Sequence, residues 1–366
     1  MTPRNPTVLA VLNPIVPQRL DGFSRFAREH GWNLMLGNRL GPGRMPPCDG
    51  AIFTLRGSKG ELTLLRQLRR RGIPVVDLAL TCPDISLPRV VSDHNAIGRM
   101  AAAHFRERGF DNLAWFSSGW SNVHRLRFAG FATGLGNHPR RLTSANMESL
   151  LGALPKPLGV LTYDEVDASH ILAACRALDL SVPEDVSVLG IGNDPYLCES
   201  QSIPISSIEP DLAAGAYRGA ELLQRLMSGK RPPKHPVLMK PTGIVSRTST
   251  DTLVHPDPTI RQAFAYIHRN LSRPFGSTET ATAIGIDRAK LDALFAAKVG
   301  HSVGKEILRQ RLIRVKRLLK DPALPVGTIA TSCGFCNIGY LSNIFRRETG
   351  RTPSDWRKAQ SPTARR

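Results

Sequence analysis

The sequence of 366 residues lacks a long apolar run and is poor in cysteine. No segment approaches the ~18 consecutive apolar residues that a membrane-spanning helix needs. The apolar stretch Val8–Leu12 is ended by Asn13 and Pro14, well short of the apolar core of a secretory leader. Six cysteines in a chain of this length do not make the dense framework of a small secreted domain. We therefore expect a cytoplasmic protein with reduced thiols and without a membrane partner.

The sequence also lacks the short motifs that mark common classes of enzyme. It contains no G-x-S-x-G, no P-loop and no G-x-G-x-x-G segment, because Gly190-Ile191-Gly192 is not followed by the third glycine of a dinucleotide turn. Cys333 and Cys336 form a CxxC pair, but no second pair or spaced histidine pair completes a zinc site, and the βαβ setting of a redox pair is absent. These absences predict a protein that is not an enzyme and that has no cofactor or metal.

Acidic residues are scarce relative to basic ones, and the imbalance is uneven along the chain. The 49 Lys+Arg and 30 Asp+Glu give a net charge of +19. Residues 256–366 hold 20 Lys+Arg against 8 Asp+Glu, a net charge of +12 in the last third of the chain. Basic side chains gathered in one region are typical of nucleic-acid binding. The alternative interpretation is a solvated helical surface that has no partner.

The first 250 residues alternate short β-branched runs with amphipathic segments of helical period. This alternation predicts parallel strands joined by crossover helices, in two doubly wound α/β lobes: residues 1–112 with 236–250, and residues 113–235. Ligands bind at the carboxyl ends of the strands in such sheets. The turns expected to face a ligand follow Leu12, Ser117, Tyr163 and Gly192. The expected strands are 7–12, 50–55, 74–78, 89–92, 113–117, 158–163, 186–192 and 237–245, and the expected helices are 19–30, 59–71, 94–109, 121–135, 167–179 and 211–227.

The pattern changes at residues 251–258, a polar segment with prolines that we interpret as a linker. Residues 259–360 show only helical periodicity, with glycine or proline at or near the expected helix ends. An all-α domain is therefore predicted to follow the α/β domain. Its expected helices are 259–270, 277–284, 288–299, 303–320, 326–332, 338–349 and 353–358.

Two segments of this all-α domain share one plan: a short helix, a tight turn at a glycine, and a longer basic helix. They are residues 278–299, with the turn at Gly285, and residues 327–349, with the turn at Gly334. Both predict helix-turn-helix motifs. The helix expected between them, 303–320, would be about 27 Å long. That length can hold two recognition helices about one DNA turn, ~34 Å, apart on a single face.

The second motif resembles the signature of the AraC/XylS family of transcription regulators. The matching residues are Cys333-Gly334-Phe335, Tyr340-Leu341, Phe345-Arg346-Arg347, Gly350 and Thr352-Pro353-Ser354-Asp355-Trp356-Arg357. The resemblance implies that the starts of both recognition helices enter adjacent major grooves of double-stranded DNA. Candidate base contacts are Arg288 and Lys290 in the first motif and Asn337, Ser342 and Asn343 in the second. The alternative to a base contact, for any single Arg or Lys side chain, is a contact with a DNA phosphate. We expect phosphate contacts of Arg346 and Arg347.

Several stretches of the first domain resemble the sensor of LacI-type regulators, which has a two-lobed periplasmic-binding-protein-like fold. They are Gly72-Ile73-Pro74-Val75-Val76, Val91-Ser92-Asp93, Arg125-Leu126-Arg127-Phe128-Ala129-Gly130-Phe131 and Val182-Pro183-Glu184-Asp185-Val186-Ser187-Val188-Leu189-Gly190. The resemblance implies a sugar bound between the lobes and contacted by Arg127 and Asp164. The alternatives are that Arg127 is a surface charge and that Asp164 caps a helix. The family usually has an aspartate where this chain has Gly192, so either Asn193 and Asp194 replace it or the ligand differs.

A sensor placed before the DNA-binding domain is similar to the arrangement in the xylose-responsive regulators of the AraC/XylS family. That resemblance implies an activator of carbohydrate-utilisation genes that acts with RNA polymerase, with D-xylose as a possible effector. LacI-type sensors usually form homodimers, and we expect helix 94–108 to contribute to the contact. Closure of the lobes on a ligand would then reorient paired DNA-binding domains on their operator half-sites. The alternatives are a sugar receptor without a transcriptional role and a regulator that responds to another kind of ligand.

Overall fold

The chain folds into two compact units, residues 1–253 and 254–366. The computed structural model describes residues 5–37, 47–251, 257–319 and 321–360. Within these residues the first unit is α/β and the second contains only helices, as predicted. Of the predicted linker 251–258, residues 252–256 lie outside the described residues. None of the described helices is long and apolar enough to cross a bilayer.

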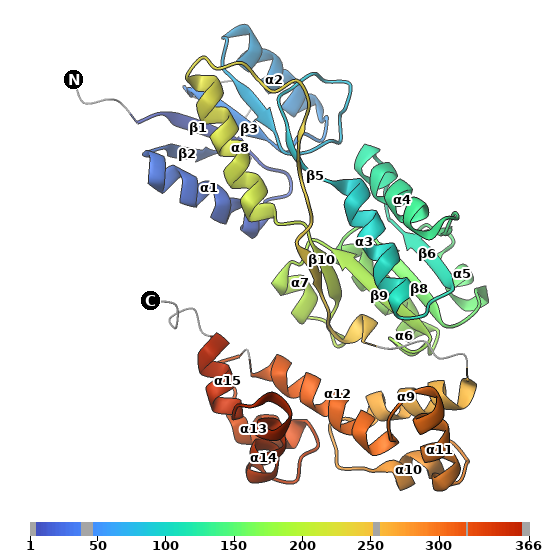
Figure 1. Ribbon diagram of the computed structural model, residues 1–366. Helices are drawn as coiled ribbons and strands as arrows, with labels where there is room; N and C mark the ends of the chain where they lie inside the picture. The colour runs from blue at the N-terminus through green and yellow to red at the C-terminus, as the bar shows by residue number, and fades with distance from the viewer. Residues whose placement is uncertain (1–4, 38–46, 252–256, 320, 361–366) are drawn as a thin grey trace. The chain divides into compact units, whose positions relative to one another are not determined.

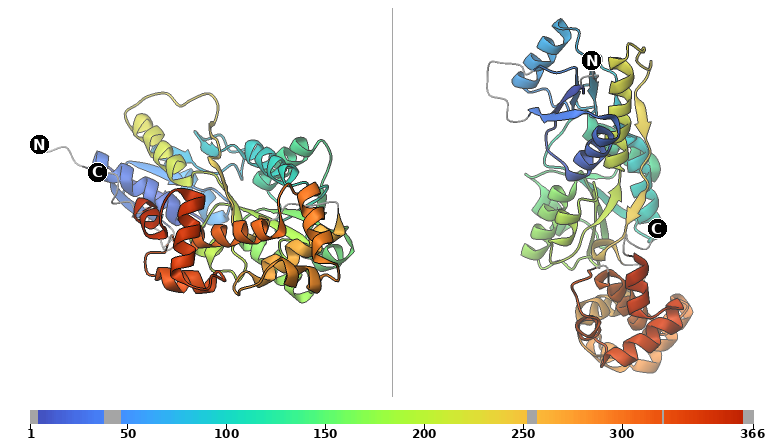
Figure 2. Two further views of the ribbon diagram at one scale, coloured as in Figure 1. Left: turned by 60° about the horizontal axis from the view of Figure 1, so that its bottom comes forward. Right: turned by 90° about the vertical axis from the view of Figure 1, so that its left-hand side faces the viewer.

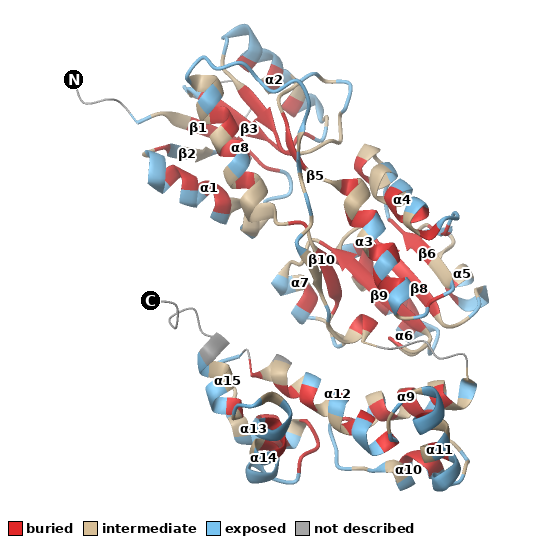
Figure 3. Ribbon diagram, in the orientation of Figure 1, coloured by how far each residue is buried: buried red, intermediate tan, exposed pale blue. Residues whose placement is uncertain are grey.

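The first lobe of the α/β unit is a parallel sheet with helices on both faces (Figure 1). Its elements are β1 (Thr7–Val11), α1 (Pro17–His30), β2 (Asn33–Leu36), β3 (Gly50–Phe53), α2 (Lys59–Arg70), β4 (Val75–Asp77) and α8 (Leu212–Met227). The strand order is β2-β1-β3-β4. Because side chains alternate along a strand, Val8 and Ala10 pack against α1 and α8, while Leu9 and Val11 pack against α2. The central strands β1 and β3 are therefore buried on both faces (Figure 3).

The second lobe is a larger sheet in the order β12-β10-β9-β8-β6-β7, in which only β12 is antiparallel to its neighbour. Its elements are α3 (His94–Glu107), β6 (Asn112–Phe116), α4 (Asn122–Leu135), β7 (Arg140–Leu142), α5 (Met147–Ala153), β8 (Leu158–Thr162), α6 (Glu165–Ala177), β9 (Val186–Ile191), α7 (Pro195–Glu199), β10 (Ser206–Glu209), β12 (Gly243–Val245) and a 3₁₀ turn at Thr248–Thr250. A separate two-stranded sheet joins β5 (Val90–Ser92) to β11 (Val237–Met239).

The lobe boundaries differ from the predicted ones. Helix α3 packs against α4 of the second lobe, and α8 packs against α1, β3 and β4 of the first. The predicted strand 237–245 is two strands in two sheets, since β11 pairs with β5 and β12 pairs with β10. The predicted division, residues 1–112 with 236–250 against residues 113–235, thus places α3, α8 and β12 in the wrong lobe. The alternation of strand and helix predicts the elements, but it does not say which sheet each helix covers.

Helices α3 and α4 lie side by side in very close contact (Figures 1 and 2). A Cβ on Gly98 of α3 would lie 2.3 Å from the carbonyl oxygen of Arg127, and a Cβ on Gly130 of α4 would lie 2.3 Å from that of Asn95. Only glycine permits this approach. The face of α3 that carries Gly98 is therefore used inside the protomer, so only the remaining face of the predicted dimer helix is open to a partner.

The helical unit contains helices close to the seven predicted ones. They are α9 (Pro258–Asn270), α10 (Ser277–Ala283), α11 (Arg288–Lys298), α12 (Val303–Leu318), α13 (Val326–Ser332), α14 (Ile338–Thr349) and α15 (Pro353–Gln360). Two apolar cores hold this unit together, one around Phe264 and Phe295 and one around Phe335 and Phe345. Helix α12 contributes to both cores, for example through Val303 and Val315, and so connects the two halves (Figure 1).

Candidate ligand and DNA sites

Arg127, the predicted sugar contact, lies on α4 beside the end of β8. Its Nη1 donates to the carbonyl oxygen of Tyr163, and its guanidinium carbon lies 4.6 Å from the centroid of the Tyr163 ring. Its Nε donates to His94 Nδ1 at 3.4 Å. Burial lowers the pKa of His94 well below its usual value, and the charge of Arg127 lowers it further, so the imidazole accepts as the neutral form. Arg127 is thus held at a strand end and is not a free surface charge.

Two aromatic side chains that the sequence analysis did not name, His124 and Trp120, lie at the same strand ends. His124 stacks on Tyr163 with ring centroids 3.7 Å apart, and its Nδ1 lies 2.7 Å from Ser121 Oγ. Burial, followed by the charges of Arg127 and Arg56, lowers the pKa of His124 to about 4. Trp120 is 47% exposed and lies in the turn after β6. The turn after Ser117 was predicted to face a ligand. The position of Trp120 and His124 shortly after the end of a predicted strand could therefore have identified them.

The first lobe contributes polar side chains from α1 and from the turn after β3. Gln18 Nε2 donates to the backbone oxygen of Asn193 at 3.2 Å, which links the two lobes. Burial lowers the pKa of the neighbouring Arg19 to about 10, and the charges of Arg127 and Arg56 act in the same direction. Arg56 Nε donates to the backbone oxygen of Asn13 at 2.9 Å. Arg19 and Arg56 were missed because nothing in their local sequence separates them from the many surface arginines.

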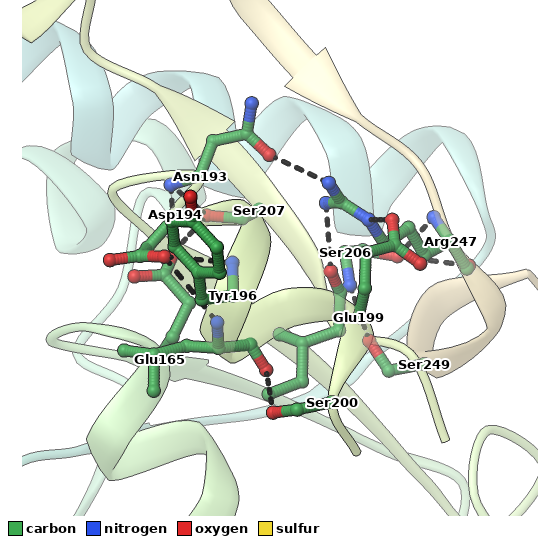
Figure 4. A network of polar contacts seen from close by, with 12 residues as sticks. Glu165, Asn193, Asp194, Tyr196, Glu199, Ser200, Ser206, Ser207, Arg247 and Ser249 are labelled. Atoms are coloured by element: carbon green, nitrogen blue, oxygen red, sulfur yellow. Dashed lines mark hydrogen bonds and ion pairs between the residues drawn. The ribbon is translucent and has the colours of Figure 1, made fainter. Parts of the chain in front are cut away.

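The other three predicted ligand contacts all have partners within the protein, and Figure 4 shows two of them, Asn193 and Asp194. Asp164 Oδ1 accepts from the backbone N–H of Asp167 at 2.9 Å and caps α6, as the alternative interpretation proposed. Asp194 Oδ1 accepts from the N–H of Tyr196 at 2.9 Å and caps α7. Asn193 Nδ2 donates to Glu209 Oε2 at 2.9 Å, and its Oδ1 accepts from Arg247 Nη2 at 3.0 Å.

Gly192, which stands where the LacI-type family usually has an aspartate, faces a buried carboxylate. Its φ is +142°, and a Cβ on it would lie 2.7 Å from Glu165 Oε2. Glu165 accepts hydrogen bonds from the Asn193 N–H at 2.8 Å and from the Ser207 hydroxyl (Figure 4). Burial raises the pKa of Glu165 above its usual value, and these hydrogen bonds act against that rise. The space for a side chain at position 192 is therefore occupied by Glu165.

The first helix-turn-helix motif consists of α10 and α11. Asp287 caps α11 by accepting from the N–H groups of Ala289 and Lys290, at 2.8 and 3.2 Å. Leu291 and Phe295 of α11 are buried in the core. This orientation leaves Arg288 and Lys290 exposed, and Arg288 forms an exposed ion pair with Asp292 at 3.5 Å. The predicted base-contacting residues thus lie on the solvent face at the start of the recognition helix.

The second motif consists of α13 and α14. Asn337 caps α14 by accepting from the N–H of Tyr340 at 2.7 Å. Ile338 and Tyr340 are each 49% exposed, an apolar surface at the start of the helix. The residues predicted to contact DNA along this helix differ in exposure: Ser342 is half-buried, and Asn343, Arg346 and Arg347 are exposed. Arg347 Nε pairs with Glu348 at 3.1 Å.

The turn of the second motif packs against the first half of the helical unit. A Cβ on Gly334 would lie 2.5 Å from the carbonyl oxygen of Arg273, and the φ of Gly334 is +71°. Arg311 of α12 donates to the same carbonyl at 2.9 Å, and its guanidinium lies 5.1 Å from the Phe275 ring and 6.0 Å from the Phe335 ring. These contacts give the two motifs a defined spacing along α12.

The CxxC pair lies at this same turn. Cys333 is buried and Cys336 is exposed, and neither forms a disulfide. Among the described residues no group of three or more His, Cys, Asp or Glu side chains is placed to hold a metal ion.

A two-lobed domain with polar and aromatic side chains at its strand ends, joined in one chain to paired helix-turn-helices, defines a ligand-sensing transcription regulator. Residues 102–250 match the model of a periplasmic binding protein-like domain, and residues 280–359 match that of a helix-turn-helix domain. The two matched domains and the relatives described next support the predicted resemblance to AraC-type regulators that carry a periplasmic-binding-like sensor.

Similar proteins include two that are named xylose operon regulatory protein. The one from Escherichia coli K12 is 26% identical over 290 residues and the one from Haemophilus influenzae is 25% identical over 288 residues; each match covers 74% of this chain and 74% of the relative. A solved structure described as the xylose-binding transcription activator XylR matches with a TM-score of 0.80 and 21% identity, covering 99% of this chain and 100% of that chain. At a sequence identity of 21%, this match shows that the two proteins share a fold.

Proposed function

We propose that this regulator is cytoplasmic, responds to a sugar or sugar derivative, and activates carbohydrate-utilisation genes as a homodimer that acts with RNA polymerase. The observation that carries the proposal is the position of Arg127, held by Tyr163 and His94 at a strand end of the second lobe, the lobe that Gln18 links to the first. The xylose operon relatives make D-xylose or a related compound a candidate effector. We expect no enzyme activity, since the relatives are transcription regulators.

In this proposal the ligand contacts come from both lobes. Gln18 Oε1 is buried and has no hydrogen-bond partner among the described residues, so it can accept from a ligand hydroxyl. Asp164 and Asp194 each use Oδ1 for a helix cap, which leaves Oδ2 for a hydroxyl. Arg127 supplies planar donors of the kind that bind paired oxygens. Both side-chain polar atoms of Asn193 are already bonded, so we assign it a positioning role.

The signal is proposed to reach the DNA-binding domain through Asn193 and Arg247. Asn193 accepts from Gln18 of the first lobe through its backbone oxygen and from Arg247 through its side chain. Arg247 is also paired with Glu199 at 2.6 Å, and its side chain is only 8% exposed (Figure 4). Arg247 directly precedes the segment that connects to the helical unit. A change in lobe closure at Gln18 would therefore alter the contacts of Arg247, which lies shortly before that connection.

On DNA, we propose that the exposed starts of α11 and α14 read base edges in successive major grooves. Arg288 and Lys290 supply donors for guanine, and Asn343, supported by Ser342 and the capping residue Asn337, supplies the amide that suits adenine. Arg346 and Arg347 contact phosphates.

Replacing Arg127 by alanine tests the sensing site. We expect Arg127→Ala to abolish the thermal stabilisation produced by an effector, which for the native protein is ~2.7 kcal/mol at 100 times the Kd, while DNA affinity without effector is unchanged. A thermal-shift titration and a fluorescence-anisotropy DNA titration on the same sample measure both quantities. If the variant were stabilised as strongly as the native protein, the sensing site would have to lie elsewhere.

Replacing Arg346 by alanine tests the phosphate contact. The variant should bind all duplex sequences more weakly, with a preference among them that is unchanged, and the slope of log affinity against log salt should become shallower by about 1. DNA titrations at several salt concentrations, with specific and unrelated duplexes, give both quantities. A loss confined to one sequence would instead assign base readout to Arg346.

A further inference from the structure

The start of the second recognition helix, α14, exposes apolar side chains where the first recognition helix exposes basic ones. Ile338, the first residue of α14, and Tyr340 are each 49% exposed. Residues 337–345 contain no lysine or arginine, and Arg346 and Arg347 lie about two turns further along the helix. Helix α11, by contrast, begins with the sequence Arg-Ala-Lys. The two motifs therefore present different chemistry to a duplex, although they share one plan.

Local contacts hold the apolar start of α14 in a defined position. Asn337 caps the helix by accepting from the N–H of Tyr340 at 2.7 Å. The ring of Tyr340 lies near that of Phe335, which is buried in the core, with the two centroids 6.1 Å apart. Leu341 is fully buried and fixes the rotation of the helix about its axis. Ile338 is therefore exposed at a helix start whose position and orientation are fixed.

Gly339 lets the backbone of this helix start approach another surface closely. It is exposed, and a Cβ placed on it would lie 3.3 Å from the capping oxygen of Asn337. Asn343 lies four residues further on, so it shares the face of Gly339, and it is also exposed. Because no side chain stands at position 339, the helix backbone can come close to the floor of a groove. The short side chain of Ile338 then reaches the base edges beside Asn343.

The chemistry of Ile338 selects its partner on the duplex. An apolar side chain satisfies none of the hydrogen-bond donors or acceptors on a base edge, and covering such a group without a partner is costly. The C5-methyl group of thymine is the apolar group that a base pair presents in the major groove. An isoleucine at the start of a recognition helix therefore favours thymine, whereas the cations at the start of α11 favour guanine.

We propose that Ile338 contacts the methyl group of one or two thymines, so that the second motif selects an A·T-rich half-site while the first motif selects a half-site that contains guanine. Arg346 and Arg347, further along α14, hold the helix in the groove through the phosphates. This inference rests on the proposed reading of base edges by α14 and names the base that the start of this helix recognises.

Selection of duplexes from a random pool by the full chain supplies the binding site for the test. We expect the enriched duplexes to share a guanine-containing stretch and an A·T-rich stretch, with centres about one helical turn apart. Each thymine of the tightest duplex is then replaced in turn by deoxyuridine, which removes the methyl group and keeps the base pair. At one or two positions of the A·T-rich stretch, fluorescence anisotropy should show binding weakened about fourfold, the effect of one buried carbon.

Variants of Ile338 assign the methyl effect to that side chain. Ile338→Ala should bind the thymine duplex about tenfold more weakly than the native protein does, and it should bind the deoxyuridine duplexes nearly as well as the thymine duplex. Ile338→Val should retain most of the methyl effect, because it keeps a branched apolar side chain. Ile313→Ala is the matched control, because it makes the same change on an exposed isoleucine of α12, outside both recognition helices. It should bind every duplex as the native protein does.

Three results would overturn the proposal: a selected site without an A·T-rich stretch, deoxyuridine at every thymine without loss of affinity, or a methyl effect of the same size in the native protein and in Ile338→Ala. The last result would assign the methyl effect to another residue or to the deformability of the duplex. Failure of the proposed reading of DNA as a whole is distinct, because no duplex would then be enriched from the pool.

Discussion

Substituting Gly334 by alanine should destabilise the helical unit by about 3 kcal/mol and weaken its binding to DNA. The left-handed conformation at φ +71° costs an alanine roughly 1–2 kcal/mol. The added Cβ would also lie 2.5 Å from the Arg273 carbonyl oxygen, which is backbone and cannot rotate away, and such overpacking costs roughly 1–3 kcal/mol. Relief requires the second motif to move away from the first, which changes the spacing that two adjacent grooves demand. Urea unfolding of the full chain, followed by hydrogen exchange in α13 and α14, measures the destabilisation.

Gly285→Ala is the matched control for this prediction. Gly285 occupies the turn of the first motif with nearly the same φ, +73°, but a Cβ there would meet nothing within 4 Å. It should therefore show the conformational cost alone and keep the spacing of the motifs. Equal losses of stability and of DNA affinity in the two variants would show that the close contact at Gly334 has no energetic role.

Substituting Gly98 by alanine should destabilise the α/β unit by about 2 kcal/mol and impair the response to effector. A Cβ on Gly98 would lie 2.3 Å from the backbone oxygen of Arg127 and 2.4 Å from the backbone N of Phe131, so α3 and α4 must separate. The cost of overpacking, roughly 3 kcal/mol when backbone opposes it, exceeds the gain of ~1 kcal/mol from replacing glycine in a helix. The separation displaces the segment of α4 that positions Arg127, so effector affinity should fall although the arginine is retained.

Gly152→Ala on α5 supplies the comparison, since Gly152 is exposed and a Cβ there would meet nothing within 4 Å. It should be neutral or slightly stabilising. Unfolding and effector titrations on both variants test the prediction, which fails if Gly98→Ala is as stable and as responsive as Gly152→Ala.

Most elements of the fold could be predicted because their signals are local. Hydrophobic period, capping residues and turn glycines predicted every helix of the DNA-binding unit and the main strands and helices of the sensor. Strands β2, β7 and β10 were missed although β4 and β5 are as short, because β7 and β10 are mostly polar and β2 is a partly exposed edge strand. The exchange of α3 and α8 between lobes was not predictable either, since a chain that passes several times between two sheets can place a helix on either one.

For the candidate sites, sequence and tertiary structure determined different things. The spacing of residues determined the two helix-turn-helix motifs, the exposed basic start of α11 and the resemblance that identified Arg127. Only the tertiary structure showed that Glu165 occupies the space beside Gly192 and that His94 and Tyr163 contact Arg127. It also distinguished Gly334, which is crowded by the Arg273 backbone, from Gly285, around which a Cβ would meet nothing within 4 Å, although each is the turn glycine of a helix-turn-helix motif. The physical reason is that caps, turns and periodicity depend on residues that are neighbours along the chain. The surroundings of a side chain and the crowding of a backbone depend on distant segments that come together only in the folded protein.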